Sequence, residues 1–297
     1  MIEVRKIGSL QWIDVVMPTH DEARQLISVY GISPEIVDKS ILPSVRPDVA
    51  HTADSIYTAL HVPILERRKN EITISKDEID FIVREKDVVT IHYASYEPLV
   101  EFIKILEVNE VTERRKYNHG TDLFFEMLRH IIDSERHIVT ILISELERVE
   151  KMIFSSKEKR AVHLISNLAR AIQHFKRTFR GQRAALDQIN FSSPLFQYIK
   201  DEHVRILEDS HLAEEILHEM QDANTAMLHS KEHDSIQILT IVSCTLLLPT
   251  FVYDGAHIIS SLMTGNATTT QIAWLILTLS GFATAVYLLL RPKSSHE

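Results

Sequence analysis

The chain has few of the residues on which several classes of protein depend. Cys244 is the single cysteine among 297 residues, which excludes a disulfide framework. Seven glycines are too few to favour a nucleotide site, and no phosphate-binding glycine-rich loop, H-E-x-x-H motif or nucleophile elbow is present. We find no catalytic constellation and predict that the protein is not an enzyme.

Positive charge is also scarce relative to negative charge. Lysine and arginine number 32 against 41 aspartates and glutamates, which gives a net charge of −9. Proteins that bind nucleic acid present basic patches to its phosphates, so we predict no nucleic-acid partner. An acidic chain is compatible with cations as partners. The N-terminal residues contain no long apolar run, so we expect no signal peptide.

Charge is nearly absent from one long C-terminal stretch. Between Ser235 and Leu290 the only charged side chain is Asp254. Two apolar segments lie there, at about residues 236–263 and 271–290, and a bilayer core about 30 Å thick needs roughly 20 residues of helix. The alternative is a buried hairpin in a soluble core. Two adjacent segments with so little charge favour a transmembrane hairpin.

The charges around this hairpin predict its orientation. The connecting segment TGNATTT is uncharged, whereas Arg291 and Lys293 follow the second span. Positive residues favour the cytosolic side of a membrane. We therefore predict a multi-pass protein of the cell (inner) membrane with both termini in the cytosol.

The chain before the spans divides into two parts. The runs SIYTALHVPIL and DFIVREKDVVTIHY are typical of strands, and EARQLISVYG predicts a helix that ends at Gly31. Later residues repeat apolar side chains at three- and four-residue steps, as helices do. The last of these helices meets no glycine or proline before the first span. The predicted parts are a cytosolic α/β domain (1–114), a helical stalk domain (115–235), a two-helix transmembrane hairpin (236–291) and a cytosolic tail (292–297).

This order of elements, with several local matches, resembles the CorA family of magnesium transporters. WIDVVMPTHDEARQLISVYGISPEIVDKSILPSVRP resembles the family's opening strand, helix and Arg-Pro turn, and DFIVREKDVVTIH resembles its strand pair. YIKDEH resembles its stalk segment, HDSIQILT keeps Leu239 and Thr240, and Pro249 matches the proline of the first span. The resemblance covers nearly the whole chain. It implies a CorA-like fold, with an α/β cytosolic domain, a long helical stalk and two C-terminal transmembrane helices.

The chain also departs from the family pattern. The family's hallmark triplet Gly-Met-Asn does not occur, and the acidic outer loop is replaced by TGNATTT. His233 and Gln237 stand where the family has asparagine and lysine. The sequence therefore resembles a divergent member, whose fold follows the family more closely than its selectivity for hydrated magnesium does.

The resemblance implies a homopentamer in the lipid bilayer, with the first span of each subunit around a central pore. Divalent metal ions are the implied partners, with magnesium the family's ion, both transported and regulatory, and no permanently bound cofactor. Apolar rings at Ile236 and Leu239 match the family's gate, and such rings can gate by dewetting. The alternative for each residue is packing between helices. The expected pore-lining residues are His233, Ile236, Leu239, Thr240, Cys244, Leu247, Phe251, Asp254 and His257.

Two aspartates are the leading candidates for metal binding. A carboxylate at the centre of a membrane span costs at least about 2.5–3.5 kcal/mol, so Asp254 is expected to face a pore rather than lipid. The alternative is an interfacial residue beside Gly255. Asp201, in YIKDEH, matches the family's stalk aspartate that binds a regulatory divalent ion between subunits. Its partner is expected among three acidic residues of a neighbouring subunit, Asp77, Glu78 and Asp80.

The stalk adds histidines and further carboxylates. His211, His218, His229 and His233 follow at steps of 7, 11 and 4 residues, which places them on one helix face. Imidazole favours zinc, nickel, cobalt or copper, whereas magnesium prefers oxygen ligands. The alternative is a solvated helix face. Further stalk candidates for metal binding are His211, His218, Glu215 and Asp222.

Three functions remain open from the sequence. The first is transport of magnesium or another divalent cation through a pore, and the second is transport of zinc, cobalt or nickel in particular. The third is a non-conducting, membrane-anchored scaffold or sensor. The missing triplet supports the second and third, whereas the predicted pore face and Asp254 argue against the third.

Overall fold

The computed structural model describes residues 1–68, 71–112, 116–155, 158–264 and 276. Contacts divide the chain into two compact units, Met1–Thr225 and Ala226–Glu297. The first unit contains both the predicted α/β part and most of the predicted stalk. The separation of these two parts at residue 114 therefore stays a prediction.

The first unit is built on one six-stranded mixed sheet. The strand order is β1-β2-β6-β5-β4-β3. β2 and β6 are parallel, and the other neighbours are antiparallel. β4 and β5 pair along their whole length as a long hairpin. The strands are β1 (Ile2–Ile7), β2 (Leu10–Val16), β3 (Asp48–His51), β4 (Ile56–Arg68), β5 (Glu71–Val83) and β6 (Asp87–His92).

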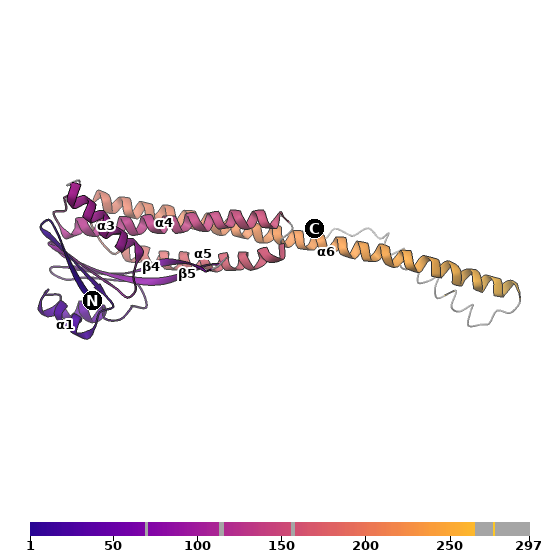
Figure 1. The fold of residues 1–297 in the computed structure, drawn as a ribbon, viewed down its shortest axis with the longest axis horizontal. Helices are drawn as coiled ribbons and strands as arrows, with labels where there is room; N and C mark the ends of the chain where they lie inside the picture. Colours follow the sequence, from indigo (N-terminus) through magenta and orange to yellow (C-terminus); the bar gives the residue numbers. More distant parts are fainter. Residues whose placement is uncertain (69–70, 113–115, 156–157, 265–275, 277–297) are drawn as a thin grey trace. The chain divides into compact units, whose positions relative to one another are not determined.

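Two short helices, α1 (His20–Ser28) and α2 (Pro34–Lys39), cover one face of this sheet (Figure 1). α1 begins with a capping box, in which the Thr19 hydroxyl accepts from the Glu22 amide and the Glu22 carboxylate accepts from the Thr19 amide. Gly31 follows the helix with a φ of +66°, a conformation that glycine adopts without strain. The predicted helix end at Gly31 is thus confirmed to within a few residues.

The other sheet face packs against α3 (Glu97–Thr112), α4 (Gly120–Ile153) and α5 (Glu158–Leu186). Alternation along the strands sends Trp12 and Phe81 to this face, where Trp12 meets Phe102 of α3 and Phe81 meets Phe124 of α4. The ring centroids are 5.9 and 5.2 Å apart.

Helix α6 (Pro194–Met263) is uninterrupted, as the sequence predicted. In the first unit it lies beside α4 and α5 (Figure 1). Its packed face recurs every three or four residues, while the opposite face is exposed. The buried apolar residues of this part are Phe196, Ile199, Ile206, Ala213, Leu217 and Met220.

In the second unit, residues 226–263 are the last part of α6. An 18-residue window in this helix has a mean hydropathy of 1.9, and none of the window is buried. Among the described residues this is the one helix that is long and apolar enough to cross a membrane. The predicted second span, the outer loop after Thr264 and the cytosolic tail lie outside the described residues, apart from Ile276. The transmembrane hairpin therefore stays a prediction.

Gly120 is expected to be essential for packing the start of α4. A Cβ atom there would collide with the Arg84 carbonyl oxygen and lie 2.8 Å from that of Asp87. Gly120→Ala should therefore destabilise the fold by about 1–3 kcal/mol, which thermal unfolding measures as a fall of several degrees. Gly181→Ala is the control, because its Cβ would lie 3.4 Å from Pro47 and helix propensity favours alanine. Equal melting temperatures for Gly120→Ala and the wild type would contradict this packing.

Candidate functional site

The exposed face of α6 in the first unit carries a regular series of carboxylates. Asp201, Glu208, Glu215 and Asp222, here called the acidic row, are exposed and separated by seven residues each. Seven residues make nearly two turns and advance about 10.5 Å, so the four side chains leave the helix on one side. None of the four forms an ion pair with another described residue. The row therefore presents unpaired negative charge along about 30 Å of helix.

The sequence pattern predicts a metal-binding role for Asp201, Glu215 and Asp222 but not for Glu208. The seven-residue repeat of carboxylates becomes informative only with the structure, which shows which face of α6 is packed. Ile199, Ile206 and Ala213 define that packed face, and the acidic row lies on the opposite side.

In the second unit, seven of the nine predicted pore residues share one side of α6. At 100° per residue they fall within about 80° of one another, and α6 continues through Pro249 without a break. Leu239 and His257 lie roughly a quarter turn to one side. Thr240 and Phe251 are half-buried, whereas the others are exposed, Ile236 by 62%. The seven are His233, Ile236, Thr240, Cys244, Leu247, Phe251 and Asp254.

The stalk histidines have different surroundings. His211 Nδ1 lies 2.9 Å from Lys176 Nζ, and His211 Nε2 lies 3.3 Å from Arg180 Nη2. A metal ion at His211 would meet both positive charges, so these contacts do not support the predicted metal role of His211. His218 is exposed, and its Nδ1 lies 3.3 Å from Gln221 Oε1, its one hydrogen-bond partner among the described residues, so its predicted role stays open.

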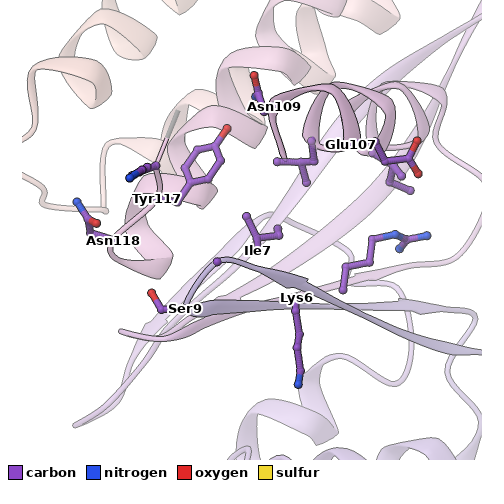
Figure 2. A pocket seen from close by; sticks show the side chains of 12 residues that line it. Lys6, Ile7, Ser9, Glu107, Asn109, Tyr117 and Asn118 are labelled. Atoms are coloured by element: carbon purple, nitrogen blue, oxygen red, sulfur yellow. The ribbon is translucent and has the colours of Figure 1, made fainter. Parts of the chain in front are cut away.

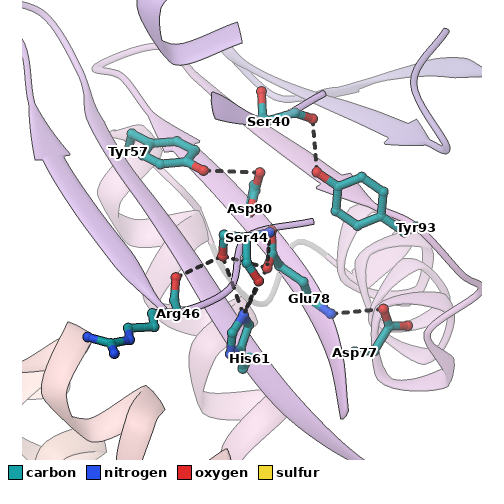
Figure 3. Close-up of polar contacts among 9 residues, drawn as sticks. All are labelled: Ser40, Ser44, Arg46, Tyr57, His61, Asp77, Glu78, Asp80 and Tyr93. Carbon is teal, nitrogen blue, oxygen red and sulfur yellow. Dashed lines mark hydrogen bonds and ion pairs between the residues drawn. The ribbon is translucent and has the colours of Figure 1, made fainter. Parts of the chain in front are cut away.

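Two of the three residues that are expected to bind a regulatory ion together with Asp201 are buried. Glu78 is 2% exposed and Asp80 0%, on the face of β5 that the segment around Ser44 covers (Figure 3). His61 Nε2 lies 2.9 Å from a Glu78 oxygen. The expectation that Glu78 or Asp80 reaches a neighbouring subunit is therefore wrong. Asp77, which is half-buried, is the one candidate left.

The surroundings of Glu78 and Asp80 shift the pKa values of these two buried carboxylates in opposite directions. Burial raises the pKa of Glu78, but hydrogen bonds from His61 and Ser44 outweigh burial and hold this pKa below its usual value. Burial and the nearby Glu78 raise the pKa of Asp80 well above its usual value, while the Tyr57 hydroxyl donates to it at 3.2 Å. The two carboxylates are thus part of the buried polar interior on this face of the sheet.

A second buried network joins three helices. Gln182 Nε2 of α5 donates to Glu135 Oε1 of α4 at 3.0 Å, and Gln182 Oε1 lies 3.1 Å from His203 Nε2 of α6. Burial raises the pKa of Glu135 to about 8 against the opposing Gln182 hydrogen bond. Burial, followed by the positive charge of Arg183, lowers the pKa of His203 to about 3. At neutral pH the network is therefore largely uncharged, and it fixes which face of α6 turns outward.

No metal site is complete within one chain, as far as the structure describes it. The described residues contain no group of three or more His, Cys, Asp and Glu side chains that could hold a metal ion. A cavity of about 640 Å³ lies between the β1–β2 turn and the end of α3 (Figure 2). Its lining has one carboxylate, from Glu107, beside three cations, Arg5, Lys6 and Lys116, so it does not suit a divalent cation.

The structure thus combines an α/β domain with a long helix that carries exposed carboxylates and ends in an apolar segment long enough to cross a membrane. The chain belongs to the family described as CorA-like Mg²⁺ transporter protein, which matches residues 8–253. Members of this family are ion transporters and not enzymes.

Solved structures show the same fold at low sequence identity. The CorA magnesium transporter from Methanocaldococcus jannaschii is 18% identical over 97% of this chain and 91% of its own, with a TM-score of 0.70. The full-length CmaX protein is 16% identical over 95% of this chain and 88% of its own, with a TM-score of 0.71. The ZntB cytoplasmic domain from Vibrio parahaemolyticus is 13% identical over 76% of this chain and 90% of its own, with a TM-score of 0.54. No curated protein has a significant sequence match to the chain.

The buried Glu135 should make the stability of the fold depend on pH. Its pKa rises from 4.5 in the unfolded chain to about 8, so the folded protein holds more protons and loses stability as pH rises between these values. Relative to Glu135→Gln, the wild type should lose about 1.4 kcal/mol per pH unit from roughly pH 5 to 8. Thermal unfolding of both proteins across this range measures the difference.

The control for this experiment is Glu147→Gln, which changes an exposed carboxylate on the same helix. It should follow the wild-type pH profile. A parallel profile for Glu135→Gln and the wild type would show that Glu135 does not hold its proton in the folded protein.

Proposed function

We propose that this chain is the subunit of a membrane transporter for divalent cations, in which the exposed sides of α6 line the ion pathway. Family membership supports divalent cations as the transported class. The observation that carries the proposal is the acidic row, four exposed carboxylates on one side of α6 without ion-pair partners among the described residues of their own chain. Such a row is costly to bring together in several copies unless cations occupy the space between them.

Assembly gives these residues a function that one chain does not provide. In a homopentamer arranged around α6, each rung of the acidic row becomes a ring of five carboxylates. Symmetry would then bring together several carboxylates around one cation, a group that the described residues of a single chain do not contain. Rings of negative charge focus the field and raise the local concentration of cations. The acidic row thus forms a cytosolic attraction zone for the ion.

The apolar part of α6 supplies the membrane step of the proposal. Ile236 and Leu239 would form dewetting gate rings, and the bilayer would cover the remaining apolar surface of residues 226–263. The predicted second span and the cytosolic position of both termini complete this topology in the cell membrane.

In this proposal Asp254 supplies the negative charge that a cation-selective filter requires. Its burial in lipid would cost at least about 2.5–3.5 kcal/mol at the helix centre, which favours a wet, pore-facing position. Five aspartates around one axis repel, and a bound divalent cation relieves that repulsion. This ring would select cations although the sequence contains no Gly-Met-Asn triplet. His257 lies one turn further along the helix.

Magnesium is the ion that the family favours, and oxygen ligands in the acidic row suit it. A specific observation supports a second candidate. His218, His229 and His233 are exposed on the same helix, and imidazole favours zinc, cobalt or nickel. A divalent ion held between Asp201 and Asp77 of a neighbouring copy would add regulation by cytosolic metal.

A matched pair of variants tests the acidic row. Glu208 belongs to the row, whereas the exposed Asp209 lies about 100° away on the helix. Glu208→Gln should lower initial divalent-cation uptake into proteoliposomes roughly threefold or more at low salt, and the loss should shrink as salt screens the field. Asp209→Asn removes the same charge and should leave the rate nearly unchanged. Equal effects of the two variants would mean that net charge matters and the row does not.

A further inference from the structure

A second charged site lies away from the acidic row, between α5 and α6 of the first unit. A cavity of about 450 Å³ is open there to solvent. Its residues all fall within Met1–Thr225, so the site belongs to one compact unit. The lining residues are Gln173, Lys176, Arg177, Arg180, His211 and Glu214.

Positive charge exceeds negative charge in this cavity. Lys176 and Arg177 are adjacent on α5 and Arg180 follows about one turn later, and the lining contains a single carboxylate, from Glu214. Glu214 pairs with the buried Lys176, whose side chain is 7% exposed. Arg177 and Arg180 have no carboxylate partner among the described residues. Two guanidinium groups thus remain unneutralised in a chain whose net charge is −9.

The contacts of His211 point to a missing acceptor. A neutral imidazole has one acceptor nitrogen and one donor N–H. Nδ1 lies 2.9 Å from Lys176 Nζ, which can only donate. Nε2 lies 3.3 Å from Arg180 Nη2, another donor. In either neutral tautomer, one N–H of the ring therefore faces another donor and no acceptor is in place for it.

We propose that this cavity binds a phosphate-type oxyanion, either free phosphate or the phosphoryl group of a phosphomonoester. Oxygen atoms of the anion would accept from Arg177, Arg180 and His211 Nε2–H, and guanidinium groups match phosphate oxygens in pairs. The anion would link α5 to α6. This site does not depend on the proposed transport function.

Calorimetric titration of the full-length protein in detergent tests the site. The probes are inorganic phosphate and AMP, added at constant ionic strength to a chloride buffer. Wild-type protein should bind phosphate saturably, and Arg177→Gln/Arg180→Gln should raise the Kd at least tenfold. Tighter binding of AMP than of phosphate would identify a phosphomonoester, and equal binding would identify free phosphate. In both cases the double variant must lose the binding.

Arg170→Gln is the matched control, because Arg170 is exposed on α5 outside the cavity. Its Kd should stay within about twofold of the wild type. The melting temperature without phosphate checks the fold of each variant, and the two single variants replace the double one if it melts early. Absence of saturable phosphate binding by the wild type, or unchanged binding by a folded variant, would overturn the proposal. A smaller oligomer for the variant without phosphate would also overturn it, because the cavity would then bind a carboxylate of a second copy.

Discussion

The rotation of α6 about its own axis is the constraint on which the first unit depends. The hydrogen-bonded chain from Glu135 through Gln182 to His203 sets this rotation, because each member is buried and has few alternative partners. His203 also stacks on Phe179, with the two ring centroids 3.7 Å apart, and this contact adds to the same restraint. With this face fixed inward, the acidic row must face outward. A buried polar network can thus determine where unpaired charge is presented.

α6 meets different surroundings along its length. In the first unit one side packs on α4 and α5 while the other carries carboxylates, and from Ile236 onward the residues of α6 are mostly apolar. The seven-residue spacing of the acidic row continues in the sequence to His229 and Ile236, so the repeat passes from carboxylate to imidazole to an apolar side chain. This order suits a cation that is first attracted in water and then admitted through a narrow apolar gate.

The sequence predicts regular elements of this fold well and side-chain partners poorly. Alternation in SIYTALHVPIL and helical periodicity before residue 236 depend on local pattern, and both predictions are confirmed by β4 and α6. Glu78 and Asp80 show the limit, because two carboxylates on a strand look the same in sequence whether they face water or a histidine on the next strand. His211 is a second case, since its partner Lys176 is 35 residues away on another helix. Glu208 was missed because its meaning depends on the packed face of α6.

The central claim is that α6 lines a pathway for divalent cations, and metal uptake into proteoliposomes tests it most directly. Purified full-length protein and its Asp254→Asn variant would be reconstituted at equal density and supplied with Mg²⁺, Zn²⁺, Co²⁺ or Ni²⁺ under an inside-negative potential. We predict saturable uptake of at least one metal by the wild type and a strong loss in the variant, which keeps the side-chain shape but removes the negative charge at residue 254. If the reconstituted wild type transports no metal above protein-free vesicles, or if Asp254→Asn transports at the wild-type rate, the account is contradicted.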